Sequence, residues 1–182
     1  MKYRISLFVL FVVTLIQLRA ATTFEKGTFY WIRSARYGGK VWTLGAGQTS
    51  AAIQLNAPSA TNDRQVWTVT ELSGSYRLIN PFGQQAAHNT SDGRIEATEN
   101  NGSDESQLWK LEPAGQGNYL LIPANRPTQA VRAGADGKLT LTTKTAAKND
   151  PACQFKLEQS PQAGFDPDAC YRIEAATRPG FV

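Results

Sequence analysis

The feature that most constrains this chain is a threefold internal repeat. Each copy opens with a tyrosine followed two positions later by Ile or Leu, at Tyr30, Tyr76 and Tyr119. Each copy also carries a glutamine near its end, at Gln65, Gln107 and Gln154. A period of about 45 residues indicates a repeat architecture, because a unit this small cannot bury an apolar face alone.

Within each copy the residue pattern is that of β-strands. Short stretches such as QVWTV, YRLI and NYLLI are separated by Gly, Asn, Asp and Pro. No segment after the N-terminal apolar run keeps an apolar period of 3.6 residues, so almost no helix is expected. Residues 85–97 align without a gap on residues 129–141, and each contains an Asp-Gly pair. These pairs predict tight primed turns in two-residue hairpins.

Three copies of about four strands, closed around a shared core, predict an all-β fold and specifically a β-trefoil. We expect repeats at 28–72, 75–114 and 117–158. A three-bladed propeller would use the same number of strands, but so few blades close poorly.

The spacing of each repeated glutamine from the bulky residue two positions later places both on one face of a strand. Trp67 and Trp109 are therefore expected in the core, and the alternative is that they are exposed sugar platforms. In the third copy this position falls on Lys156, beside Phe155, so the symmetry is expected to break there.

The N-terminal residues 1–20 have the character of a secretory signal peptide. Lys2 and Arg4 precede an apolar run over residues 5–18, which Arg19 and small residues end. The run is short for a membrane span, which needs roughly 20 residues, so a retained anchor is the minor alternative. We therefore expect a secreted or extracytoplasmic protein with no membrane contact after cleavage.

The net charge excludes one class of partner. Without the first 20 residues, Lys+Arg falls from 19 to 16 against 15 Asp+Glu. A mature chain of nearly balanced charge lacks the basic surface that binding to a polyanion requires. Nucleic acid is therefore not an expected partner.

The two cysteines allow two interpretations. Cys153 and Cys170 could form a disulfide in an oxidising compartment. Alternatively, Cys153 is a small buried apolar residue and Cys170 belongs to another module.

With its Gln-x-Trp pairs, Tyr-led strands and hairpin turns, the chain resembles the ricin-type lectin family over residues 24–158. The resemblance implies a β-trefoil and, in each competent repeat, a sugar pocket. Such a pocket has an acidic residue, an amide, an aromatic platform and an Asn-Gln pair. Carboxylate and amide oxygens accept hydrogen bonds from sugar hydroxyls, while the ring covers the apolar sugar face.

Carried over residue by residue, this pattern is largely replaced. The acidic position falls on Thr43, His88 and Arg132; the amide position on Gln54, Glu96 and Thr140. The platform falls on Asn56, Thr98 and Thr142, and the Asn of the pair on Arg64, Ser106 and Cys153. The resemblance thus implies the fold but not the usual galactose-type pocket.

The candidate carbohydrate-binding residues lie mainly in the first repeat. They are Thr43, Gln54, Asn56, Arg64, Gln65 and Tyr37, with His88 and Glu96 from the second repeat. Tyr37 is the preferred exposed ring, with an ordinary surface tyrosine as the alternative, and Trp31 is a further ring candidate. Trp42 is expected in the core because it aligns with Ala87 and Val131. His88 has no second ligand at metal spacing, so no metal, cofactor or catalytic site is expected.

The tail at residues 159–182 is expected to be a linker followed by a C-terminal strand or the start of a further module. Tyr171 and Ile173 repeat the Tyr-x-Ile spacing after Cys170. The tail is weakly similar to the opening of arabinose-binding trefoils of the arabinofuranosidase B type.

These observations favour a secreted, non-catalytic module that binds a polysaccharide or glycan. One alternative is a degenerate trefoil with a structural or protein-interaction role. The other is an ancillary domain of a truncated glycoside hydrolase, with an appended catalytic domain as its partner.

Overall fold

A computed structural model describes residues 24–47 and 49–162. It confirms the expected all-β fold, a β-trefoil. Its twelve strands are β1 Tyr30–Ser34, β2 Val41–Leu44, β3 Ser50–Asn56, β4 Thr68–Leu72, β5 Ser75–Asn80, β6 Gln85–Asn89, β7 Ile95–Glu99, β8 Trp109–Gly115, β9 Asn118–Pro123, β10 Gln129–Ala133, β11 Leu139–Thr143 and β12 Phe155–Gln159. Three short 3₁₀ turns and one helix complete the list: η1 Asp63–Gln65, η2 Glu105–Gln107, η3 Pro151–Cys153 and α1 Lys144–Ala147.

The strands form three units of four, which we call unit 1 (β1–β4), unit 2 (β5–β8) and unit 3 (β9–β12). Gly115 and Gln159 each lie one residue past the predicted ends of their repeats. The predicted signal peptide and the predicted tail strand, with Cys170, Tyr171 and Ile173, lie outside the described residues.

Six strands close into a barrel. The order β4-β5-β8-β9-β12-β1 follows from antiparallel pairings, and a bridge between Tyr30 and Trp67 joins the two ends. That bridge has two backbone hydrogen bonds, Tyr30 N to Trp67 O at 2.8 Å and Trp67 N to Tyr30 O at 2.9 Å. Closure leaves the barrel without an open sheet edge.

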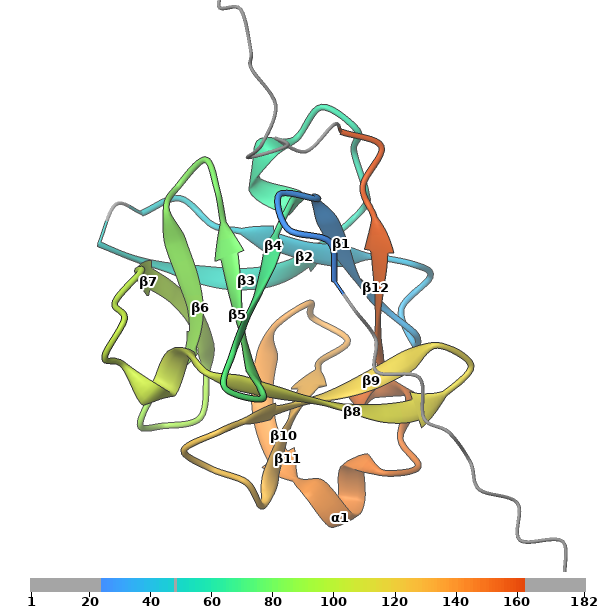
Figure 1. The fold of residues 1–182 in the computed structure, drawn as a ribbon. Coiled ribbons are helices and arrows are strands. Elements are labelled where there is room, and N and C mark those ends of the chain that lie inside the picture. The colour runs from blue at the N-terminus through green and yellow to red at the C-terminus, as the bar shows by residue number, and fades with distance from the viewer. Residues whose placement is uncertain (1–23, 48, 163–182) are drawn as a thin grey trace, which may run out of the picture.

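The other six strands form three hairpins, β2–β3, β6–β7 and β10–β11, arranged around the centre of the molecule (Figure 1). The hairpins touch one another in a ring. β3 pairs with β7, while bridges join Gln54 to Lys138 and Arg94 to Thr140.

The threefold symmetry is clearest where the first and last strands of each unit meet. Tyr30 lies opposite Trp67, and Tyr76 lies opposite Trp109. In unit 3 the partner of Tyr119 is Phe155. Phe155, and not Lys156, therefore holds the third core position, and Lys156 is exposed.

The register of the third glutamine was wrong by one residue. Each 3₁₀ turn is capped by a side chain, from Asn62, Asp104 and Asp150. Three residues after each cap stand Gln65, Gln107 and Cys153, whose backbone N–H groups bond the cap carbonyls. Cys153 thus replaces the third glutamine, and Gln154 matches Val66 and Leu108. The cap spacing fixes this register, whereas the letter pattern suggested the neighbouring residue.

The two repeated glutamines are buried tethers. Gln65 Nε2 donates to Ala57 O at 2.8 Å and to Thr43 Oγ1 at 3.1 Å, while its Oε1 accepts from Ser59 N at 2.7 Å. Gln107 makes the same three kinds of bond, to Glu99 O, Thr98 Oγ1 and Asn101 N. Each side chain therefore holds the loop after a hairpin against the 3₁₀ turn that follows.

The core is built from aromatic side chains, as predicted for Trp42, Trp67 and Trp109. All three are fully buried, with Phe155. The Trp42 ring packs edge-on against Trp67 at 6.0 Å and against Phe155 at 5.7 Å. Trp67 Nε1 donates to Trp42 O, and Trp109 Nε1 donates to Ala87 O. These bonds satisfy two indole N–H groups that burial would otherwise leave without a partner.

The Asp-Gly pairs do not form the predicted primed turns. In each hairpin the glycine alone has a positive φ, 82° at Gly93 and 83° at Gly137. Thr90 O accepts from Gly93 N, and Thr90 N donates to Arg94 O, which gives a three-residue loop. A type I turn followed by a left-handed glycine suits this loop length. Positive φ at both central residues occurs instead at Ser73-Gly74, between Leu72 and Ser75.

One end of the barrel is closed by Phe24. Its ring lies 5.4 Å from Tyr30, 5.5 Å from Tyr76 and 6.5 Å from Tyr119. It therefore contacts the opening tyrosine of all three units. Glu25 N also donates to Tyr30 Oη at 2.9 Å, which holds the segment in place.

Unit 3 differs from the others by the helix α1. Four residues long, α1 follows β11 and packs Ala147 into a second apolar cluster with Leu120, Ile122, Ala130 and Cys153. Among the residues that the structure describes, no helix is long and apolar enough to cross a bilayer. Burial in the second cluster raises the pKa of Cys153 to about 11, and the Asp150 carboxylate adds to this effect.

The glutamine register gives a direct test of stability. Replacing Gln107 with Ala leaves Asn101 N and Glu99 O without partners, which should lower the free energy of unfolding by about 2 kcal/mol or more. The half-buried Gln154, which the letter pattern aligns with Gln107, serves as the matched control. We expect Gln154→Ala to change stability by under about 0.5 kcal/mol in urea unfolding. Equal losses from both substitutions would contradict the register.

The environment of Cys153 predicts an unreactive thiol in the folded protein. At pH 8 a pKa of about 11 leaves only about one thiol in a thousand ionised, and burial blocks access to it. In a Cys170→Ser variant, iodoacetamide should not alkylate Cys153 until urea unfolds the chain. Mass spectrometry measures the modification, and rapid alkylation of the folded protein would refute the burial.

Candidate functional site

The positions that the sequence aligned as a site are cross-strand neighbours in every hairpin. Thr43 pairs with Gln54, His88 with Glu96, and Arg132 with Thr140. Asn56, Thr98 and Thr142 follow two residues later on the same faces. The alignment of these positions across the three units is therefore correct, and each trio lies on the outward face of its hairpin.

In unit 1 this face is polar and has free hydrogen-bonding groups. Gln54 and Asn56 are exposed, and their side chains make no hydrogen bond with other described residues. Thr43 is 8% exposed, and its hydroxyl bonds Val41 O at 3.2 Å. Gln65 lies underneath and donates to Thr43 Oγ1. Gln65 therefore supports the face from below, while the two amides point to solvent.

Arg64 stands on η1 at the edge of this face. Its backbone N–H donates to the Asn62 cap at 3.1 Å, which fixes the turn. The exposed guanidinium makes no ion pair or hydrogen bond within the described residues. Unit 1 thus presents two amides and one guanidinium, which supply both donors and acceptors.

In unit 2 the corresponding face is largely occupied by internal contacts. Glu96 accepts from Arg94 Nη1 at 2.5 Å and from Ser50 Oγ at 2.7 Å. His88 Nε2 is buried and has no hydrogen-bond partner in the structure. A side-chain hydrogen bond from Ser106 lowers the pKa of Asp104. Because Arg94 and Ser50 already engage it, the Glu96 carboxylate is less available to a ligand than the amides of unit 1.

Unit 3 carries a salt bridge at the same place. Arg132 Nε lies 3.2 Å from Asp150 Oδ2, the residue that caps η3. The three outward faces therefore share a backbone and differ in chemistry.

The ring candidates of the first repeat do not take the platform position, which Asn56 holds. Trp42 is in the core, as predicted. Tyr37 is half-buried and packs against the main core from the loop before β2. Trp31 is covered by Arg33, whose guanidinium lies 5.3 Å from the ring centroid.

An exposed ring that the repeat pattern does not predict is Phe82. Phe82, in the turn between β5 and β6, is 50% exposed. Its signal in the sequence is its place between Pro81 and Gly83, since a large aromatic at the tip of a turn has no core to enter. Phe82 borders a hollow of about 460 Å³ at the boundary of units 1 and 2, lined by Leu44, Gly45, Gly47, Asp63, Arg64, Asn80, Phe82, Gly83 and Gln85. We call it the boundary pocket.

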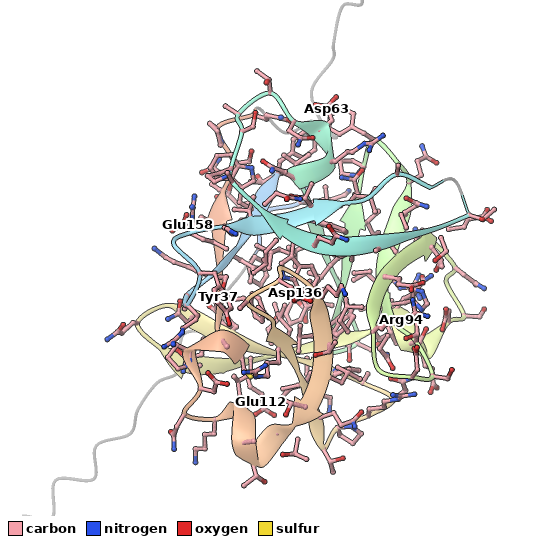
Figure 2. The ribbon with its side chains drawn as sticks, turned by 180° about the vertical axis from the view of Figure 1, so that it is seen from behind. Tyr37, Asp63, Arg94, Glu112, Asp136 and Glu158 are labelled. Carbon is pink, nitrogen blue, oxygen red and sulfur yellow. The ribbon has the colours of Figure 1, made fainter. Side chains whose placement is uncertain are left out.

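Two other hollows differ in character. The depression where the three hairpins meet has about 270 Å³ and is lined by Gln54, Glu96 and Thr140 above Ile53, Ile95 and Leu139. The α1 hollow of about 820 Å³ is lined by Glu112, Lys144 and Lys148. Figure 2 shows Asp63, of the boundary pocket, and Glu112, of the α1 hollow, at opposite ends of the molecule.

The arrangement suits binding by hydrogen bonds. Amide, guanidinium and hydroxyl groups on a shallow face can donate to and accept from a ligand rich in hydroxyl groups. Among residues 24–47 and 49–162, no three His, Cys, Asp or Glu side chains come close enough to hold a metal ion.

A scan against protein-family models and a search of curated proteins gave no match. Solved structures do match. The designed threefold-symmetric protein ThreeFoil has a TM-score of 0.61 and 22% identity, over 71% of this chain and 96% of that chain. SeviL bound to the asialo-GM1 saccharide has a TM-score of 0.57 and 15% identity, over 76% of this chain and 99% of that chain.

A lectin from Polyporus squamosus, bound to the epitope Neu5Acα2-6Galβ1-4GlcNAc, has a TM-score of 0.60 and 12% identity. The match covers 75% of this chain and 50% of that chain. At these identities the likeness establishes the fold. The protein thus has a β-trefoil fold whose outward faces carry their own set of side chains.

Proposed function

We propose that this chain is a secreted, non-catalytic carbohydrate-binding module. The observation that carries the proposal is the outward face of unit 1. There Gln54 lies opposite Thr43, Asn56 follows two residues later, and Arg64 precedes Gln65, which donates to Thr43. No hydrogen bond from another described residue engages the side chains of Gln54, Asn56 and Arg64. Two trefoils of similar fold are bound to saccharides in their own structures, which supports the same class of ligand here.

The chemistry of this face points to a neutral or weakly acidic glycan bound with modest affinity. A shallow surface excludes little water, and each neutral hydrogen bond contributes only about 0.5–1.5 kcal/mol. Arg64 supplies one positive charge, which a carboxylated or sulfated sugar would also satisfy. The N-terminal segment with its basic and apolar parts supports delivery across a membrane.

Binding is tested with residues 21–182 by affinity gel electrophoresis in soluble polysaccharides and on a glycan array. Gln54→Ala should weaken binding about threefold to tenfold, because it removes one or two hydrogen bonds to sugar hydroxyls. Gln159→Ala is the matched control, since Gln159 is an exposed glutamine on the barrel strand β12. The control should bind like the parent protein.

Tyr37→Ala belongs in the same series. If Tyr37 is the ring that covers the sugar, the substitution weakens binding, and the half-buried position predicts some loss of stability as well. Absence of retardation on every polysaccharide and of any array signal would refute sugar binding. That result would favour a structural or protein-interaction role.

A further inference from the structure

We propose that the boundary pocket is a second saccharide subsite, in which one face of a neutral pyranose stacks on Phe82. The inference rests on the proposed function and adds a site and a ligand class to it. Nothing in the resemblance places a ring at Phe82, which belongs to unit 2 while the face of Gln54 belongs to unit 1.

The ring of Phe82 is held in position although half of it faces solvent. It packs against the buried Phe29 with ring centroids 5.7 Å apart at 67°. The covered edge fixes the ring, and the exposed part offers a flat apolar surface. A sugar that stacks there covers apolar area without ordering a flexible side chain, which lowers the entropy cost of binding.

The walls of the boundary pocket are locked together by one buried amide. Asn80 Nδ2 donates to Asp63 O at 2.8 Å and to Val66 O at 2.9 Å, and Asn80 Oδ1 accepts from Gly83 N at 2.8 Å. The turn that carries Phe82 is thereby tied to η1. The ring and the charged residues on η1 keep a fixed relation, as expected of a preformed pocket.

The polar groups of the pocket match the hydroxyls of a sugar. The Asp63 carboxylate and the Arg64 guanidinium both line it, and neither forms a hydrogen bond or ion pair with another described residue. A carboxylate accepts from two neighbouring hydroxyls, while a guanidinium donates to their oxygens. The two opposite charges leave the pocket without a net charge, so it offers a uronate no net attraction and suits a neutral sugar.

The other hollows and exposed side chains give weaker support for a ligand site. In the depression between the hairpins, Arg94 is bonded to Glu96, and Lys138 lies 3.5 Å from Asp136. In the α1 hollow, Lys144 is paired with Glu112, and no aromatic ring lines it. Leu72, the other large apolar side chain with high exposure, stands at a hairpin tip and lines none of these hollows.

The test uses backbone amide spectra of residues 21–182, titrated with the methyl pyranosides of galactose, glucose and mannose. Galacturonic acid is the charged comparison. Gly45, Gly47 and Gly83 report on the boundary pocket, and Gln54 and Asn56 report on the unit 1 face. We expect at least one neutral glycoside to shift the pocket glycines, and galacturonic acid to shift them less at equal concentration.

Phe82→Ala should raise the dissociation constant measured at the pocket glycines about tenfold, because the stacked area is lost. Phe82→Tyr keeps the ring and should stay within about twofold of the parent protein. Phe82→Leu retains apolar contact with Phe29 without a flat ring, so it weakens binding even if the alanine variant is unstable. Leu72→Ala, the control for loss of an exposed apolar side chain, should bind normally.

The outcomes separate this subsite from the proposed function. Shifts at Gln54 and Asn56 with none at the pocket glycines, or unchanged affinity in Phe82→Leu, would overturn the subsite and leave carbohydrate binding in place. Stronger shifts with galacturonic acid than with any neutral glycoside would overturn the ligand class. No shift with any probe, together with no retention on polysaccharides, would overturn both proposals.

Discussion

The structure depends on the contact between the opening tyrosine of each unit and the aromatic residue at, or one residue before, the start of its last strand. These three pairs lie between neighbouring barrel strands, and the aromatic partners project into the main core. Trp42 packs against Trp67 of its own unit and against Phe155 of unit 3, so the ring of unit 1 reaches across to another unit at the centre of the core. Because each unit is too small for its own core, barrel closure and core packing form together.

Much of this architecture can be predicted from the sequence, because large aromatic residues in a small β protein are mostly buried in its core. The tyrosine spacing, the two tryptophans and the gapless alignment of units 2 and 3 predicted the correct fold and the correct equivalence of the outward positions. The third unit was harder. There a cysteine stands for the glutamine and a phenylalanine for the tryptophan. The register is revealed by the Asp150 cap, which accepts a hydrogen bond from Ala152 N, and by the pairing of Phe155 with Tyr119.

The candidate site was less predictable from the sequence than the fold. Sequence alignment placed Thr43 and Gln54 among the candidate positions, but it could not show that Glu96 is engaged by Arg94 and Ser50. It also could not find Phe82, because the wall of the boundary pocket comes from the next unit. The prediction of primed turns at the Asp-Gly pairs was wrong for a similar reason. The letters Asp-Gly allow two loop lengths, and the choice between them depends on how the hairpin meets its neighbours.

The ring at Phe24 has a practical consequence for anyone who produces this protein. Phe24 precedes the first strand and covers one end of the barrel, and it lies only a few residues after the predicted cleavage point. An affinity tag fused directly before it would crowd the three tyrosines at the barrel mouth, whereas a short glycine-serine spacer would relieve this. An expression clone that starts after Glu25 would lack Phe24 and leave this end of the barrel uncovered. The choice of start codon therefore affects the stability of the recombinant protein.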